Sequence, residues 1–393
     1  MTTPTLTTPC PAASAASPIA RYTRDGSDAL ENRIRETCEE LGRAVRAIVP
    51  ADQLRALVLA GGYGRGEGGV LSTADGDAPY NDLEFFLLIE GSPRLNEKRY
   101  GAAIHALEQR MTPVIGIDVE FKITSLEKLR SGATTMFSYD LVSGHRVVTG
   151  PADILENCAH HLDARRIPAH EATRLLMNRC SGLLFAAGRL AKSDFSQEDA
   201  DFTARNIAKA QLALGDVVLA ALGRYHWSCL TRHERLLEIS EPALPMADIL
   251  EFHSTGVTFK LHPAPHGASR ELLAALHRRV CATAWKVWSW LEEKRLGRSF
   301  PTPESYAFDP LTKCPETHAV KNALLRLRTF GPAACYAGSR FRYPRETLFN
   351  TLSVLLWDPA SASGRFLSQQ FLEPIPDAAS AMPAYARLWA RYN

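Results

Sequence analysis

A glycine-rich turn followed by an acidic apolar segment constrains this chain more than any other feature. A short apolar run, Leu57–Ala60, leads into the sequence Gly61-Gly-Tyr-Gly-Arg-Gly-Glu-Gly-Gly69. Glycines let a backbone approach a bulky anion, and successive N–H groups in such a turn form an anion-binding nest. The next apolar run begins with Asp82 and Glu84, whose spacing puts both carboxylates on one face of a strand, where they can hold a divalent metal. A phosphate cradle beside a metal clamp is what phosphoryl or nucleotidyl transfer requires.

The glycines also spell a different motif, which the context excludes. Gly64-x-Gly66-x-x-Gly69 matches the dinucleotide-binding fingerprint letter by letter. That fingerprint requires a helix directly after the glycines. Residues 70–80 instead have the composition of a polar loop, because Gly, Pro and Asp are concentrated there. We therefore reject a dinucleotide-binding fold, and the absence of Gly-Lys-Ser/Thr after the turn argues against a P-loop.

Hydrophobic periodicity predicts an α/β region around this turn. The spacing of apolar residues predicts helices over 27–49, 96–111 and 125–130, and strands over 54–60, 82–89, 114–123 and 146–151. Ser27 is a candidate N-cap of the first helix, which Pro50 ends. The strand over 82–89 is apolar on both faces, which is typical of a central strand in a covered sheet. The strand over 114–123 carries a second pair of carboxylates, Asp118 and Glu120.

The character of the sequence changes after Gly150-Pro151. Strand patterns become scarce and helical periods dominate, including one helix over 202–222 and one marked by Val320, Leu324 and Leu327. We expect an α+β protein with a disordered tail over 1–26, an α/β domain with a mixed sheet over 27–150 and an all-helical domain over 151–393. A further boundary is expected near 240–268, where Gly and Pro are frequent.

Composition limits the partners and the compartment. The formal net charge of +2 argues against a dedicated nucleic-acid binder, which usually has a basic excess. The cysteines are widely spread without a C-x-x-C pair, and no His pattern typical of zinc occurs, so free thiols in a reducing compartment are expected. No stretch approaches 18 uninterrupted apolar residues, and the first 20 residues do not resemble a signal peptide. We expect a cytoplasmic protein with no membrane span.

The order of these motifs resembles a known superfamily. Gly61-Gly62, a spacer, Asp82-Leu-Glu84-Phe and a later strand of alternating acidic and apolar residues look like the DNA polymerase β-type nucleotidyltransferases. The turn itself resembles that of bacterial PII-protein uridylyltransferases. The resemblance covers roughly residues 28–150 and implies a nucleotidyltransferase-type fold. It also implies that two Mg²⁺ ions are bound by two carboxylates of one strand and a third of a neighbouring strand, and that the Gly-Gly turn holds the NTP phosphates.

The resemblance carries the family's roles onto particular residues. Asp82 and Glu84 become ligands of both metals, and Asp118 or Glu120 the third carboxylate, with the choice between these two open. The nucleotide-binding candidates come from the turn and from the helix over 202–222: Gly61, Gly62, Tyr63, Gly64, Arg65 and Lys209. Tyr63 stands where the family often has serine, so its phosphate contact must come from the backbone.

Four alternatives accompany these assignments. Residues 63–81 form an unusually long spacer, and Asp75 and Asp77 fall nearer the usual distance; we prefer Asp82 and Glu84 because a strand is not expected around Asp77. Arg65 could pair with Glu67 instead of with phosphate. Lys209 could belong to a solvated stripe of charges that also includes Asp201, Arg205 and Asp216. One acid of the Asp118–Glu120 pair could be structural.

The expected function is Mg²⁺-dependent transfer of a nucleoside monophosphate from an NTP to an acceptor hydroxyl, with release of pyrophosphate. The acceptor is a protein side chain or a small molecule such as an aminoglycoside. The alternative is a catalytically silent nucleotide-binding or partner-binding module of the same fold. A lysine in the metal position, or only two convergent acids, would favour that alternative.

Overall fold

The computed structural model describes residues 21–264 and 267–393, which form two compact units. Unit 1 comprises the described residues up to Gly68, together with Asn81–Leu126 and Ser143–Ile154. Unit 2 comprises Gly69–Tyr80, Glu127–Val142 and Leu155–Asn393. The tail expected over 1–26 lies outside the described residues as far as residue 20. Residues 21–26 belong to unit 1, where Tyr22 is buried and Thr23 pairs with Gly68.

Unit 1 is built on a four-stranded mixed sheet with the order β5-β4-β1-β6. Its strands are β1 (Leu54–Leu59), β4 (Leu83–Ile89), β5 (Val119–Thr124) and β6 (Arg146–Thr149). β1 is antiparallel to both β4 and β6, whereas β4 and β5 are parallel. β4 therefore occupies an inner position, as its two apolar faces predicted.

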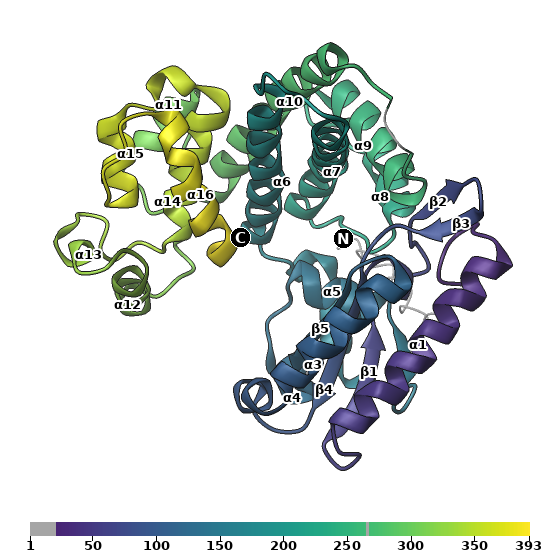
Figure 1. The fold of residues 1–393 in the computed structure, drawn as a ribbon. Helices are drawn as coiled ribbons and strands as arrows, with labels where there is room; N and C mark the ends of the chain where they lie inside the picture. Colours follow the sequence, from purple (N-terminus) through teal and green to yellow (C-terminus); the bar gives the residue numbers. More distant parts are fainter. Residues whose placement is uncertain (1–20, 265–266) are drawn as a thin grey trace, which may run out of the picture. The chain divides into compact units, whose positions relative to one another are not determined.

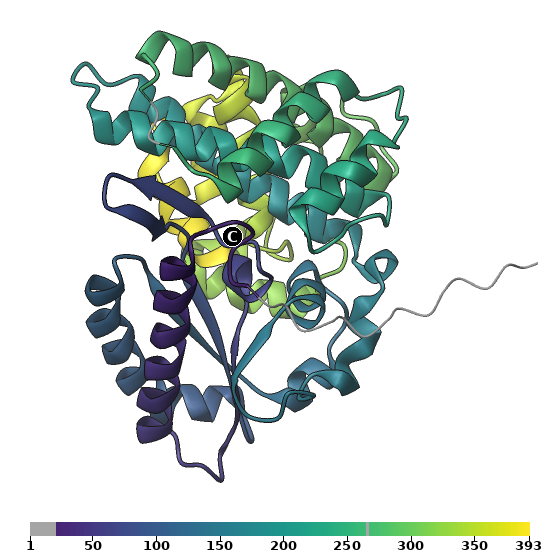
Figure 2. The ribbon, with the colours of Figure 1, turned by 90° about the vertical axis from the view of Figure 1, so that its right-hand side faces the viewer.

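Two long helices, α1 (Asp28–Ile48) and α3 (Pro93–Ile115), lie side by side over one face of this sheet (Figure 1). In Figure 2, a view turned by 90°, α1 again lies beside the strands of the sheet. The predicted N-cap is confirmed, because the Ser27 side chain accepts a hydrogen bond from the Leu30 amide. α3 continues to Ile115 and ends at Gly116, whose φ of 84° is left-handed. The predicted start of the third strand at residue 114 was therefore wrong.

The segment after the glycine turn differs most from its predicted structure. Residues 70–80 were expected to be a loop, but they form a hairpin of β2 (Val70–Thr73) and β3 (Gly76–Pro79). The two-residue connection is Ala74-Asp75, and Gly76 follows with a φ of 109° that favours glycine. Tyr80 ends the hairpin and packs edge-to-face against Phe259, with ring centroids 6.0 Å apart. The hairpin belongs to unit 2.

Helices make up the rest of unit 2, as the sequence predicted for the C-terminal part. Short helices α4 (Leu126–Ser131) and α5 (Met136–Ser143) begin within the α/β region of the sequence. The later helices are α6 (Ala169–Leu190), α7 (Gln197–Ala221), α8 (Cys229–Leu237), α9 (Met246–Leu261), α10 (Arg270–Leu296), α11 (Pro303–Phe308), α12 (Ala319–Phe330), α13 (Ala333–Tyr336), α14 (Arg345–Leu352), α15 (Gly364–Phe371) and α16 (Ala378–Tyr392). No helix among the described residues is both long enough and apolar enough to cross a membrane.

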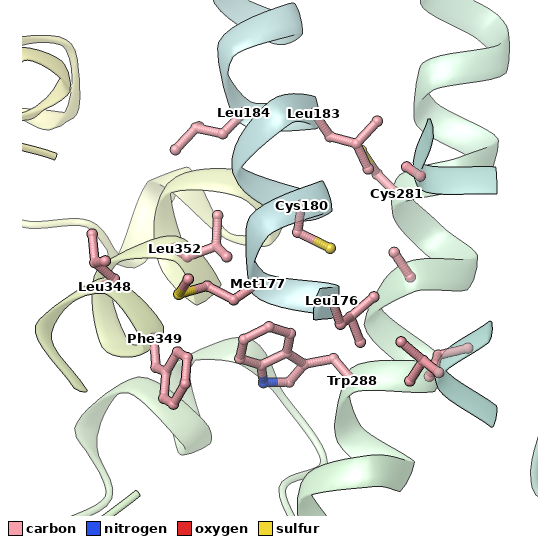
Figure 3. Close-up of a cluster of buried hydrophobic side chains, with 14 of the residues drawn as sticks. Leu176, Met177, Cys180, Leu183, Leu184, Cys281, Trp288, Leu348, Phe349 and Leu352 are labelled. Carbon is pink, nitrogen blue, oxygen red and sulfur yellow. The ribbon is translucent and has the colours of Figure 1, made fainter. Parts of the chain in front are cut away.

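One part of the core of unit 2 forms where α6, α10 and α14 meet (Figure 3). Trp288 of α10 is fully buried and packs edge-to-face on Phe349 of α14, with ring centroids 5.8 Å apart. The side chains around them come from all three helices: Leu176, Met177, Cys180, Leu183, Leu184, Cys281, Leu348 and Leu352. Burial of so many apolar side chains supplies the main driving force for folding of this unit.

Candidate functional site

The predicted carboxylates of unit 1 lie on two neighbouring parallel strands or directly before them. Glu84 of β4 is directly opposite Glu120 of β5 in the register of the pair. Because in-register residues of neighbouring strands point to the same face, the two side chains project together. One pleat period earlier, the amide of Leu83 donates a 2.9 Å hydrogen bond to the carbonyl of Asp118, which holds the entrances of the two strands side by side. Asp82 and Asp118 occupy these entrances and are exposed.

Lys122 completes this face and was missed by the sequence reasoning. Its Nζ lies 3.5 Å from Glu120 Oε2 and 3.9 Å from Glu84 Oε2. It also lies over the ring of Phe86, 5.7 Å from the centroid. A signal was present, because Lys122 follows Glu120 by two residues and so shares its face of the strand. The two glutamates are thus joined by a cation in the structure.

Glu84 has a carboxyl with a perturbed pKa. Burial raises the pKa of Glu84 above its ordinary value, and the neighbouring Asp82 and Glu120 raise it further, while Lys122 and Arg65 oppose the shift. The side chain keeps 36% of its surface exposed, so it remains reachable from solvent. A carboxyl with a perturbed pKa beside other acids is a common mark of a functional site.

The glycine turn lies directly against Glu84. The amide of Ala60 donates a 2.8 Å hydrogen bond to the carbonyl of Glu84, and a short helix, α2 (Gly61–Gly64), starts from there. Gly61 has a φ of 64°, and a Cβ at this position would lie 3.0 Å from Glu84 Oε1. The absence of a side chain at Gly61 therefore keeps the backbone open beside the carboxylate.

Other glycines of the turn are needed for packing. A Cβ at Gly64 would lie 2.4 Å from the carbonyl oxygen of Leu59, and one at Gly68 would lie 2.0 Å from the ring of Tyr63. Tyr63 is fully buried in both its side chain and its main chain, so it packs inside unit 1. Gly62 lies on the same turn, where its carbonyl accepts a 2.8 Å hydrogen bond from the Glu67 amide.

Arg65 extends from the end of the turn toward the acidic face. It acts electrostatically on Glu84, where it lowers the pKa of that carboxyl. Its aliphatic stem packs over Gly144, where a Cβ would lie 2.5 Å from Arg65 Cγ. Glu67 is buried, with 4% of its surface exposed. These positions place a guanidinium within electrostatic reach of the carboxylates.

Lys209 lies apart from these residues in sequence and belongs to unit 2. It is on α7, where both Lys209 and Arg205 are exposed and Asp201 is half-buried. The charged stripe expected on this helix was wrong for Asp216, which is buried. Its Oδ1 lies 3.0 Å from Arg232 Nε and 3.1 Å from His253 Nε2, so Asp216 belongs to an internal polar network. The alternative acids Asp75 and Asp77 are on the hairpin of unit 2, and the expectation that no strand forms around Asp77 was wrong, because Asp77 lies in β3 and pairs with Ser72.

The chemistry of the unit 1 face follows from its donors. Asp82, Glu84, Asp118 and Glu120 supply hard carboxylate oxygens, which suit Mg²⁺ better than zinc or copper. Within the described residues, no three His, Cys, Asp or Glu side chains are already gathered around a single metal position. No protein-family model matches the chain, and no curated protein matches it.

Proposed function

We propose that this protein is a nucleotidyltransferase that moves a nucleoside monophosphate from an NTP to an acceptor hydroxyl. The observation that carries the proposal is the placement of Glu84 opposite Glu120, with the open backbone of Gly61 against the same carboxylate. The turn and the acids are separated in sequence by the hairpin, yet they adjoin in unit 1. Phosphate-binding backbone beside paired acids is the arrangement that phosphoryl chemistry uses.

The strand arrangement supports the same proposal. The glycine turn follows β1, and the first acidic pair begins β4, which is antiparallel to β1. The second acidic pair begins β5, which is parallel to β4. This order agrees with what the resemblance to the polymerase β-type superfamily implies for residues 28–150.

The residues present fit two Mg²⁺ ions by the nature of their donors. Asp82 and Glu84 would hold both ions, with Glu120 or Asp118 as the third carboxylate. When bound, the ions neutralise the charge of the α-phosphate along an in-line path. The register makes Glu120 the nearer partner of Glu84, and Asp118 that of Asp82.

The chain's own groups then have defined tasks. Backbone groups at Gly61 and Gly62 bind the β- and γ-phosphates, and Arg65 adds positive charge beside them. The acceptor oxygen forms a bond to the α-phosphorus, the bond from this phosphorus to the bridging oxygen breaks, and pyrophosphate leaves. Glu120 or Asp118 accepts the proton of the acceptor hydroxyl. The acceptor is a hydroxyl of a protein or of a small molecule.

One observation favours a second candidate function. Lys122 Nζ lies between Glu84 and Glu120, where a lysine can replace a metal ion electrostatically. A catalytically silent nucleotide-binding or partner-binding module would retain this lysine–carboxylate contact and would need no metal. Lys122 is 52% exposed, so the side chain has room to swing away when a cation of higher charge competes for the carboxylates.

The deciding experiment follows the label of each α-³²P-NTP. The full chain is incubated with Mg²⁺ and cell lysate, and labelled protein, small molecules and RNA are then separated. We expect label in the protein or small-molecule fraction, and its loss in Glu84→Gln. Glu90→Gln is the matched control, because Glu90 follows β4 at its other end, where it makes an exposed 2.6 Å ion pair with Arg55.

Two results would contradict the proposal that the protein is a nucleotidyltransferase. One is the absence of label in every fraction with all four NTPs. The other is equal labelling by the wild type and by Glu84→Gln, which would trace the transfer to a contaminant. If the chain binds NTP without Mg²⁺ and transfers nothing, the silent module is the correct interpretation. Label in RNA would place the acceptor outside the class proposed here.

A further inference from the structure

Helix α12 of unit 2 buries polar side chains and exposes apolar ones. It buries the polar residues Asn322 and Arg326, which are 3% and 1% exposed. It exposes Val320, Leu324 and Leu327, at 72%, 64% and 41%. Spacings of four and three residues place these three on one stripe of the helix. A stripe of this kind normally faces the core. Here it faces outward and forms a hydrophobic patch on the surface of unit 2.

The buried contacts of the helix fix this orientation. Asn322 Nδ2 donates hydrogen bonds to Thr317 Oγ1 at 2.9 Å and to the carbonyl of Phe341 at 3.1 Å. The Arg326 guanidinium stacks on the ring of Phe330 and donates a 3.4 Å bond to Thr347 Oγ1. Rotating the stripe inward would break these contacts and bring polar groups into water. The buried contacts of Asn322 and Arg326 therefore hold the apolar stripe toward solvent.

A hollow lies between this stripe and the segment that follows it. Its volume is about 270 Å³, and its lining is mostly apolar: Val320, Ala323, Leu324, Leu327, Ala334, Cys335 and Arg340. We call these seven residues the α12 surface. The volume lies just below the usual range of roughly 300–1,000 Å³ for small-molecule pockets. It suits one or two apolar side chains inserted by a larger partner.

The sequence segment that forms the α12 surface carries charges of one sign. No acidic residue occurs between Glu316 and Glu346 in the sequence, whereas the same interval holds several cations. Lys321, Arg328 and Arg340 are exposed. A surface with an apolar centre and a basic margin complements a partner with apolar anchors and acidic flanks.

We propose that the α12 surface binds an acidic amphipathic helix of a partner protein, which inserts apolar side chains spaced by three or four residues into the hollow. This is the helix-in-groove mode of recognition. A second copy of the chain fits less well, because a two-fold interface would bring the same cations together. A lipid surface would need no hollow. The proposal is independent of nucleotidyl transfer.

The test selects peptides without assuming their sequence. A phage-displayed library of helical peptides is selected on the full chain, with counter-selection on the Leu324→Glu variant. We expect enriched peptides that combine apolar residues at helical spacing with Asp and Glu. A labelled, synthesised copy should bind the wild type, with its fluorescence anisotropy decreasing as salt is added. Leu324→Glu should weaken this binding about tenfold or more, and Arg340→Glu should weaken it and reduce its salt dependence.

A matched variant separates binding from folding. Leu272 of α10 is 61% exposed, close to the exposure of Leu324, so Leu272→Glu makes the same change elsewhere and should leave binding intact. The proposal is overturned if no peptide is enriched over the Leu324→Glu chain, or if the enriched peptides lack acids. It is also overturned if Leu324→Glu instead abolishes sedimentation with phosphatidylserine vesicles or dissolves a dimer of the wild type.

Discussion

At the scale of single residues, Glu84 combines a candidate functional position with a cost to stability. Burial raises its pKa, so the Glu84 carboxyl binds its proton more tightly in the folded protein than in the unfolded chain. A carboxyl with a raised folded-state pKa favours folding fully below the unfolded pKa of about 4.3, and that contribution is lost as the pH rises through the folded value. At neutral pH the charge on Glu84 therefore destabilises unit 1.

Glu84→Gln tests this linkage. We expect the variant to be more stable than the wild type at neutral pH, by less than about 1 kcal/mol because solvent screens a partly exposed group. The gain should vanish as the pH falls below about 4. Urea denaturation at a series of pH values measures the difference, with Glu90→Gln as the control. A gain that grows in acid would contradict the assigned direction of the pKa shift.

Gly64 is fixed by packing and not by chemistry. A Cβ there would meet the Leu59 carbonyl at 2.4 Å, which is part of the rigid β1 strand. We expect Gly64→Ala to destabilise the protein by about 1–3 kcal/mol through overpacking. A Cβ added at Gly188 of α6 would meet nothing within 4 Å, so Gly188→Ala should stabilise by about 0.5–1 kcal/mol. Thermal unfolding of both variants would decide, and a neutral Gly64→Ala would show that the turn is loose.

At the scale of elements, helix α7 is tied to α8 and α9 by a buried charge. Burial raises the pKa of Asp216, but Arg232 and His253 outweigh that effect and hold the pKa below its ordinary value. A depressed carboxyl pKa contributes stability above the unfolded pKa, and this stability is lost as the pH falls through the folded value. The network therefore holds the three helices together at neutral pH.

Asp216→Ala should consequently be among the most damaging substitutions in unit 2. It leaves the buried Arg232 guanidinium without its carboxylate, at an expected cost of about 3–5 kcal/mol at neutral pH. Glu373→Ala removes a partner from the exposed Arg387 ion pair and should cost no more than about 0.5 kcal/mol. Chemical denaturation gives both values. Equal small losses would mean that water replaces the buried carboxylate.

The elements also show what the sequence could predict. The first helix was predictable because its cap, its period and Pro50 agree, and β4 because its apolar run is uninterrupted. The hairpin was not predicted because its polar composition outweighed the Ala-Asp-Gly turn signal. The outward stripe of α12 was unpredictable in principle: periodicity shows which residues share a face, but not whether that face meets core or solvent.

The candidate site was predictable to the same extent. The sequence indicated which strands carry acids, because alternating acidic and apolar residues are a local signal. It could not choose between Asp118 and Glu120, since both share one face of the predicted strand. The register that places Glu120 opposite Glu84 is a non-local property, and so is the contact of Lys122 with both.

At the scale of the whole molecule, a bound substrate should stabilise the folded protein against unfolding. A ligand that binds only the folded protein stabilises it by about 2.7 kcal/mol at a concentration of 100 Kd. We expect a non-hydrolysable NTP with Mg²⁺ to raise the unfolding temperature of the full chain, and EDTA to reverse the shift. Differential scanning fluorimetry measures the effect. A shift that persists in EDTA, or is unchanged in Glu84→Gln, would separate nucleotide binding from the carboxylates.

The path of the chain between the two units affects how the protein can be made. The backbone passes from one unit to the other after Gly68, Tyr80, Leu126, Val142 and Ile154. On the ribosome, the hairpin and the short helices α4 and α5 are therefore synthesised before the longer helices of their own unit. Unit 1 is itself complete only once Ile154 has been made, so both segments emerge before either unit is complete. For the same reason, recombination at residue 150 would separate the segments 69–80 and 127–142 from the rest of unit 2. The two units are therefore expected to be inherited together.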